Sequence, residues 1–223
     1  MLDPGRGASR VWHRLALVLV GALTAASPAE ARPRPAPGPK LGRTILAEVN
    51  ALRRDPKAYA RVLRSYRPLY DGALLRLPGR DPIRTREGVK ALDEAIRVLE
   101  RLKPRRPLAW SAGLARAAAD HAADIGPRGR LDHQGRDGRW PHQRMARYGQ
   151  LFGTGAENLD FGFSDARGVV VHLLIDDNVP DRGHRKNLID PTFRQVGVAC
   201  GHHKIYRVVC VMDFAEAYGE HDR

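Results

Sequence analysis

The feature that most restricts the fold lies near the C-terminus, where two β-rich runs, 195–200 and 206–214, are joined by the polar stretch Gly201–Lys204. A short polar turn between two such runs predicts an antiparallel hairpin. The segments before this hairpin have helical rather than alternating apolar periodicity. A chain whose helices precede and flank a small sheet is predicted to form an α+β domain, with the helices packed on an antiparallel sheet.

Helical spacing of apolar residues sets the other elements. The predicted helices cover residues 41–65 with a break at Pro56, 84–102, 111–125, 141–147 and 165–177. Ser111 and Ser164 are the predicted N-caps of the third and the last of these. His121 shares an apolar helix face with its neighbours, so we interpret it as a core histidine. Residues 126–138 are predicted to be a loop because they are rich in Gly, Pro and Asp.

The first 31 residues have the features of a secretory signal peptide. Arginines precede an apolar run, Leu15–Ala26, which is too short to span the roughly 30 Å hydrocarbon core of a bilayer. Ala29-Glu30-Ala31 then offers small residues where a signal peptidase would cut. We predict a signal peptide at 1–31, a proline-rich spacer at 32–40, one domain at 41–219 and a tail at 220–223. The mature chain is expected to be secreted or periplasmic, with neither a transmembrane segment nor a lipid anchor.

The charge of the chain points to acidic partners. The net charge is +13, and it stays at +12 after loss of residues 1–31, which hold three arginines and two acids. Outside the cytoplasm, anionic lipids, cell-wall polymers and acidic glycans are such partners. Nucleic acid is not expected, because the basic residues are scattered among acids without a binding motif. A basic surface that is merely solvated is the alternative reading.

Cys200 and Cys210 are the only two cysteines. An even number of cysteines in an exported chain favours a disulfide, which would close a short loop within the predicted hairpin. Two buried thiols are the alternative.

Three patterns in the second half of the chain place a titratable side chain beside loop-forming residues. They are Leu131-Asp132-His133, Gly155-Ala156-Glu157-Asn158-Leu159 and Gly183-His184-Arg185-Lys186-Asn187-Leu188. In this order, behind a signal peptide, they resemble the CAP superfamily (cysteine-rich secretory, antigen 5 and pathogenesis-related proteins), and most closely its bacterial SCP-like extracellular branch. The resemblance extends from Ile45–Asn50 and Arg53, through Pro107–Trp110, to Val211–Ala215.

The resemblance implies a three-layer α-β-α sandwich in which two histidines and two acids line a central cleft. Residue by residue, His133 matches the first histidine, Glu157 the acid of the Glu-Asn motif and His184 the second histidine. The tryptophan that precedes the second acid in animal members is missing here. Asp177 is the predicted fourth member, because it extends the inward face of the helix before it, and Asp176 is the alternative.

The two histidines suggest a metal. Neutral imidazoles bind Zn²⁺ through nitrogen, so His133 and His184 are candidate ligands for Zn²⁺ or another divalent cation, as the resemblance also implies. Glu157 is then a candidate general base for a metal-bound water. Its structural alternative is a carboxylate that accepts backbone hydrogen bonds while Asn158 closes a turn. We expect Arg185 and Asn187 to tie the loop after His184 to nearby carbonyls or acids.

Covalent catalysis is not expected. No Gly-x-Ser-x-Gly elbow occurs, and both cysteines lie in the predicted hairpin. His202 and His203 are predicted to be exposed in the hairpin turn, and His142 and His172 belong to no motif.

Two functions from different classes are consistent with the sequence. The first is a noncatalytic binding module whose cleft holds a divalent ion and recognises a lipid, glycan or cell-wall component. The second is a metal-dependent hydrolase or peptidase with Glu157 as general base. The resemblance favours the first, because the same residues occur in members with unrelated activities.

Overall fold

A computed structural model describes residues 40–221 of the chain. The predicted signal peptide and nearly all of the predicted spacer lie outside these residues. The helices are α1 (Lys40–Arg54), α2 (Pro56–Arg64), α3 (Val89–Arg101), α4 (Ala112–Arg128), α5 (Pro141–Met145), α6 (Ala166–Ile175) and α7 (Gly183–Ile189). The strands are β1 (Tyr70–Asp71), β2 (Leu74–Leu75), β3 (Ile83–Arg84), β4 (Ala109–Trp110), β5 (Gly149–Phe161), β6 (Gln195–His203) and β7 (Arg207–Glu220). A 3-10 turn spans Arg67–Leu69.

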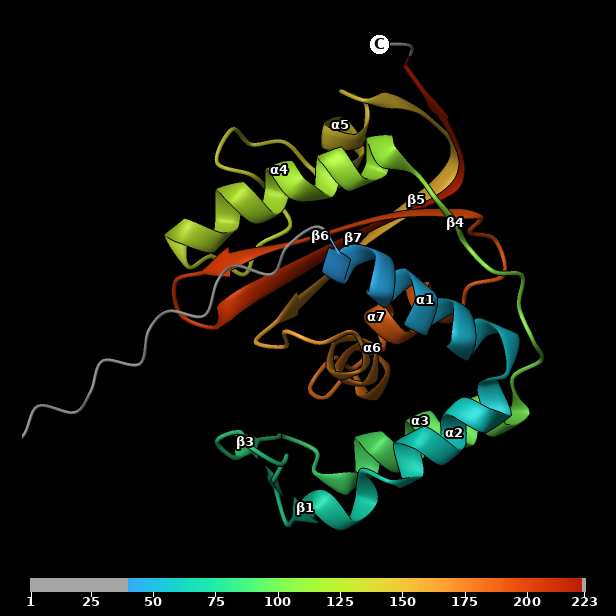
Figure 1. Ribbon diagram of the computed structural model, residues 1–223, viewed down its shortest axis with the longest axis vertical. Helices are drawn as coiled ribbons and strands as arrows, with labels where there is room; N and C mark the ends of the chain where they lie inside the picture. The colour runs from blue at the N-terminus through green and yellow to red at the C-terminus, as the bar shows by residue number, and fades with distance from the viewer. Residues whose placement is uncertain (1–39, 222–223) are drawn as a thin grey trace, which may run out of the picture. The chain divides into compact units, whose positions relative to one another are not determined.

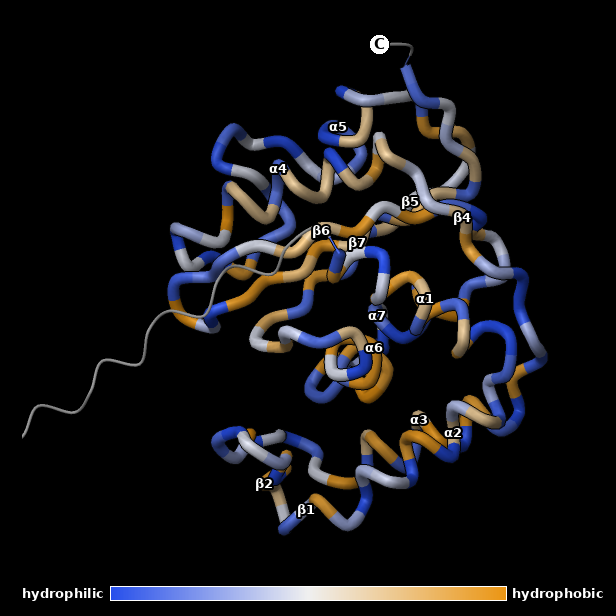
Figure 2. The backbone as a smooth tube through the Cα atoms, in the orientation of Figure 1, coloured by the Kyte–Doolittle hydropathy of each residue, from blue (hydrophilic) through white to orange (hydrophobic). Residues whose placement is uncertain are grey.

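The larger sheet is the middle layer of the domain. Its strand order is β4-β6-β7-β5, and all neighbours are antiparallel except the short β4, which runs parallel to β6. Helix α4 packs on one face through Ala118, Ala122 and Ile125, whereas α1 and α6 cover the other (Figure 1). The predicted α-β-α sandwich is therefore confirmed. Figure 2 shows the apolar stretches of β6 and β7 between these helices.

The predicted helices form close to their expected bounds. Pro56 divides the first run, because it occupies the first position of α2 while Asp55 caps that helix by accepting from the Ala58 amide. Ser111 caps α4 by accepting from the Leu114 amide. The predicted cap Ser164 is wrong by one residue, since Asp165 accepts from the Gly168 amide and starts α6. Helix α4 also continues to Arg128, into the predicted loop, with Pro127 in its last turn.

The main departure from prediction is strand β5. The sequence predicts loop structure around Gly155–Leu159, but this segment lies inside a strand of 13 residues. Its glycines and polar side chains do not show the alternating apolar pattern of a strand. The segment becomes a strand because it pairs with the long apolar strand β7, from Phe161↔Val209 to Gly149↔Glu220. A bulge between Phe152 and Gly155 interrupts that pairing.

Strand β6 lies unusually close to the helices on both sides. A Cβ built on Gly197 would lie 2.0 Å from the Ala115 amide nitrogen and 2.2 Å from the Leu114 carbonyl carbon, both in the backbone of α4. On the opposite face, a Cβ on Gly42 of α1 would lie 2.5 Å from the carbonyl oxygen of Val198. Only glycine permits backbones to approach this closely.

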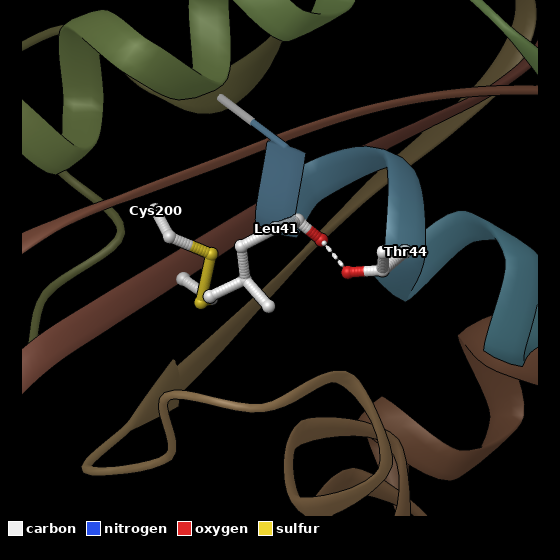
Figure 3. The surroundings of a disulfide bond; sticks show 4 residues. Leu41, Thr44 and Cys200 are labelled. Atoms are coloured by element: carbon white, nitrogen blue, oxygen red, sulfur yellow. Dashed lines mark hydrogen bonds between the residues drawn. A yellow bond between two sulfur atoms is a disulfide. The ribbon is translucent and has the colours of Figure 1, made fainter. Parts of the chain in front are cut away.

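The predicted disulfide is confirmed. Cys200 of β6 and Cys210 of β7 are directly opposite in the pairing of the two strands and form a disulfide bond. The N-terminal turn of α1 lies beside it, where Leu41 is next to the two sulfurs and its carbonyl accepts from the Thr44 hydroxyl (Figure 3). The bond thus links the two strands of the hairpin beside the start of α1 (Figure 3).

Candidate functional site

The first part of the site is a buried carboxylate held from two sides. Glu157 comes from β5, His133 from the loop after α4, and Arg144 from α5. His133 Nδ1 donates to Glu157 Oε1 at 2.7 Å, and Arg144 Nη2 donates to Glu157 Oε2 at 2.5 Å. The Glu157 side chain is 1% exposed and that of Arg144 5%. Both carboxylate oxygens are therefore engaged inside the protein.

Electrostatics favour the charged form of Glu157. Burial raises the pKa of this carboxyl, but the hydrogen bond from His133 and the positive charge of Arg144 outweigh it, so the pKa lies below the usual value. Buried His121 lies behind the pair, with Nε2 3.8 Å from Glu157 Oε1 and 2.8 Å from the carbonyl of Asp132. Burial lowers the pKa of His121, which favours the neutral ring.

A second acid, Asp213 of β7, lies directly across the strand pair from Glu157. It is fully buried, and neither of its carboxyl oxygens has a hydrogen-bond partner within the described residues. Burial and the neighbouring charge of Glu157 raise the pKa of Asp213 well above its usual value. Asp213 therefore keeps its proton to a higher pH than an ordinary aspartate.

Asp213→Asn is expected to stabilise the protein at pH 7. The unfolded aspartate loses its proton near pH 4, whereas the folded one keeps its proton to a higher pH, so Asp213 costs stability as the pH rises above about 4. Removing that cost should add about 1 kcal/mol or more at pH 7 and little below pH 4. Urea unfolding at pH 3.5 and pH 7 measures the difference. The exposed Asp71→Asn is the control, and a gain that does not depend on pH would contradict the argument.

The second part of the site pairs His184 with Asp176. His184 lies in α7, and its Nδ1 donates to Asp176 Oδ1 at 2.7 Å, while Asp176 Oδ2 accepts from the Arg185 amide at 3.1 Å. The predicted Asp177 instead accepts from the amides of Arg86 and Glu87 before α3. Helix α6 ends at Ile175, and Asp176 turns the chain in the left-handed region with φ 55°. The helical pattern of α6 therefore stops before residue 177, and the acid that pairs with His184 is Asp176, the neighbour of the predicted Asp177.

The other predicted residues hold the segment around His184. Asn158 of β5 donates to the carbonyl of His184 at 3.0 Å, and Asn187 donates to the amide oxygen of Asn158 at 2.8 Å. Arg185 is buried, and its guanidinium donates to Glu94 and to the carbonyls of Leu174 and Ile175. These bonds tie α7 to strand β5 and to α3.

Two consecutive residues of the edge strand β5 contact the two histidine–carboxylate pairs from opposite faces of that strand. Successive side chains alternate between the faces of a strand. Glu157 is on the face that α4 covers, as is Leu159, whereas Asn158 is on the face toward α7. No hydrogen bond or ion pair joins the side chains of the two pairs within residues 40–221.

Two hollows adjoin the first pair. One, of about 330 Å³, is lined by Trp140, Pro141, His142, Met145, Leu151, Gly155, Ala156 and Glu157. Trp140 at its edge is 48% exposed. The other, of about 390 Å³, is lined by residues 129–133, including His133.

The sequence does not predict several of the residues at or near the site. Asp213 is the one with a recognisable signal, since it is an acid inside the apolar run 208–214. Arg144 resembles any other arginine in a chain that is rich in them. His172 and Asp160 also form a pair, with Nδ1 2.6 Å from Oδ1, and burial raises the pKa of Asp160. His203, predicted to be exposed, is buried.

Comparison with known proteins identifies a family. The family model described as "Cysteine-rich secretory protein family", CAP, matches residues 46–214. No curated protein sequence matches the chain.

Three solved structures are similar to part of the chain. An outer surface protein from Borrelia burgdorferi is 24% identical, with a TM-score of 0.43 over 50% of this chain and 78% of its own. An extracellular protein containing a SCP domain from Bacillus anthracis is 23% identical, with a TM-score of 0.40 over 56% of this chain and 37% of its own. A cysteine-rich secretory protein from Staphylococcus aureus is 18% identical, with a TM-score of 0.35 over 58% of this chain and 38% of its own. The chain thus spans less than two thirds of the last two.

Proposed function

Because the chain belongs to the cysteine-rich secretory protein (CAP) family, we propose that it is an exported binding module that catalyses no reaction. Its ligand is a lipid, glycan or cell-wall component, which occupies the hollow beside Trp140. Among the helices of residues 40–221, none is both long enough and apolar enough to cross a membrane.

The state of Glu157 carries this proposal. A general base needs a pKa near the working pH and access to the proton that it removes. Glu157 has a lowered pKa, a side chain that is 1% exposed, and both oxygens engaged by His133 and Arg144. These features suit a carboxylate that holds β5, α5 and the loop of His133 together. They do not suit one that accepts protons in turnover.

The hollow has the chemistry of a binding surface. Trp140, Met145 and Leu151 give it an apolar wall, and His142 and Glu157 are its polar lining residues. A sugar ring stacks on an exposed indole face, and an acyl chain packs against the same wall. Sites of this size that are mostly apolar, with a few polar groups, are typical of small-ligand binding.

A divalent cation, Zn²⁺ or another, fits the histidines by their donor chemistry. Metal-ligating histidines usually give their second ring nitrogen to a carboxylate, as His133 and His184 do here through Nδ1, and no hydrogen bond from residues 40–221 engages the Nε2 of either. Within residues 40–221, no three His, Cys, Asp or Glu side chains gather as metal ligands. We therefore propose a site with these two protein ligands, completed by water or by the bound ligand, in which the cation would orient polar groups of that ligand.

The binding test uses the purified mature protein with muropeptides and with a fatty acid as separate probes, and it measures affinity by isothermal titration calorimetry. Trp140→Ala should weaken binding of the responding probe at least tenfold, because it removes the stacking wall. Phe152→Ala is the matched control, since Phe152 is an equally exposed aromatic residue on β5 that does not line the hollow. If Trp140→Ala bound the probe as tightly as wild type, the proposal that the hollow beside Trp140 holds the ligand would be refuted.

The hydrolase alternative is tested on the same preparations. Glu157→Gln should leave muropeptide and peptide processing at the background level of the wild type. Measurable turnover in the wild type that is lost in a folded Glu157→Gln variant would favour the hydrolase and refute the noncatalytic proposal. Bound metal, measured in parallel, should fall in His133→Ala with His184→Ala; unchanged content would refute the two-histidine site.

A further inference from the structure

The turn between β6 and β7 carries large apolar side chains that are exposed to solvent. Ile205 is 66% exposed and is the most exposed large apolar residue of the described chain, and Tyr206 beside it is also exposed. Leu131, in the loop after α4, is 53% exposed. A Cβ on Gly129 would lie 3.2 Å from Ile205 Cδ1, so this loop and the turn are neighbours. We call Leu131 with Lys204–Tyr206 the hairpin tip.

The hairpin tip is held in place by a buried histidine. His203 Nδ1 accepts from the amides of Ile205 and Tyr206 at 3.2 and 3.1 Å, and Nε2 donates to the carbonyl of Arg130 at 3.1 Å. The amide of Lys204 donates to the carbonyl of Gly126 at 2.9 Å. The turn is thus fastened to the end of α4 and to the loop after it. Its apolar side chains are presented by a fixed backbone, so little conformational entropy is lost when they are buried against a partner.

Basic residues surround the hairpin tip. Lys204 belongs to the tip, and Arg128, Arg130 and Arg207 are close to it in the chain. Arg80 is also near, since its guanidinium and the Tyr206 carbonyl both lie within 4.0 Å of a Cβ built on Gly162. The two nearby acids are already engaged, since Asp124 pairs with Arg128 at 2.7 Å and Asp132 lies 3.5 Å from Arg130. Lys204 and Arg207 have no ion-pair partner within residues 40–221. The surface around the apolar side chains is therefore net positive.

We propose that the hairpin tip docks the domain on the surface of an anionic lipid bilayer. Ile205 and Leu131 enter the headgroup boundary, Tyr206 lies at the level of the headgroups, and the surrounding cations contact anionic lipid phosphates. Apolar and aromatic side chains ringed by Lys and Arg are the pattern of interfacial membrane binding. A soluble polyanion would satisfy the cations but leave Ile205 and Leu131 in water, so the bilayer is the better partner.

This surface is separate from the hollow beside Trp140. Arg207 and Asp213 lie six residues apart in β7, and Asp213 is opposite Glu157, which lines the hollow. Six residues of a strand span about 20 Å. Membrane docking and ligand binding therefore use different residues, and each can fail without the other.

Vesicle flotation of the mature protein tests the docking. The vesicles contain phosphatidylglycerol and phosphatidylcholine in equal parts, or phosphatidylcholine alone. Wild type should float with the anionic vesicles at low salt, and Ile205→Ser should weaken binding about tenfold, because the transferred apolar side chain is lost. Phe152→Ser is the matched control, since Phe152 is 50% exposed on β5 away from the turn and should bind as wild type does.

Charge variants separate the electrostatic contribution to vesicle binding from the apolar contribution. Lys204→Glu should weaken flotation several-fold, whereas Arg54→Glu, an exposed basic residue at the end of α1, should not. Binding should also fall as salt rises. The proposal is overturned if wild type does not bind the anionic vesicles, if it binds phosphatidylcholine equally well, or if Ile205→Ser binds like wild type. Muropeptide and fatty-acid binding, measured on the same variants, should be unchanged.

Discussion

Arg144→Met is expected to reduce the free energy of unfolding by about 3–5 kcal/mol at pH 7, because it leaves the buried carboxylate of Glu157 without its cation. The guanidinium also donates to the carbonyls of His133 and Arg139, at 2.8 and 3.1 Å, and these bonds would be lost together.

The effect of Arg144→Met should depend on pH in a defined direction. The pKa of Glu157 is lowered in the folded protein, so its ionised form adds stability above the unfolded pKa, roughly 4.3, and that stability is lost as the pH falls through the folded pKa. The difference between wild type and variant should therefore be greatest at neutral pH and shrink below pH 4. Urea unfolding at several pH values measures it.

Two further variants make the interpretation specific. Arg144→Met combined with Glu157→Gln should lose less stability than Arg144→Met alone, since no buried charge remains without a partner. Arg147→Met, three residues along, removes an exposed ion pair with Asp120 and should cost less than about 1 kcal/mol. Equal losses for Arg144→Met and Arg147→Met would show that the buried pair does not hold the site.

Gly197→Ala is expected to destabilise the domain by about 3 kcal/mol or more, or to prevent folding. The added methyl would lie 2.0 Å from the Ala115 amide nitrogen, and both contacting groups are backbone atoms that cannot rotate away. Helix α4 would have to move off the sheet and lose its packing through Ala118, Ala122 and Ile125. Soluble yield and urea unfolding report the loss.

Gly201→Ala is the matched control on the same face of β6. A methyl there would lie 3.6 Å from Ala122 Cβ, which is ordinary van der Waals contact with the same helix. The variant should unfold within about 1 kcal/mol of wild type. If Gly197→Ala were as mild as Gly201→Ala, the close approach of α4 to the sheet would be refuted.

The sequence predicts those parts of the fold whose signal is local. The break at Pro56, the cap at Ser111 and the hairpin that carries Cys200 and Cys210 all follow from nearby residues. Strand β5 does not, because its Gly-rich stretch becomes a strand only through pairing with β7. That pairing is set by residues about 50 to 70 positions away, and it leaves no periodicity in β5 itself.

The site is divided in the same way. His133, Glu157 and His184 are recognisable as an ordered set, and the sequence restricts the fourth member to Asp177 or Asp176. What the sequence cannot supply is the partner that fixes the state of Glu157, because Arg144 reaches it from a separate helix and no local pattern marks it. The choice between Asp176 and Asp177 depends on where α6 ends, and a single left-handed residue decides that.

The bulge in β5 has a consequence for how length changes could be tolerated in relatives of this chain. Glu157 and Asn158 reach their two histidines only because consecutive residues of the strand face opposite ways. A one-residue deletion between the bulge and Asn158 that shifts the pairing with β7 by one residue would exchange the faces of Glu157 and Asn158. His133 would then face Asn158, and His184 would face Glu157. The same deletion before Phe152 would change only the far end of the strand, since the irregularity between Phe152 and Gly155 already interrupts the pairing. Insertions and deletions should therefore accumulate on the Gly149 side of the bulge and be excluded from Gly155 onward.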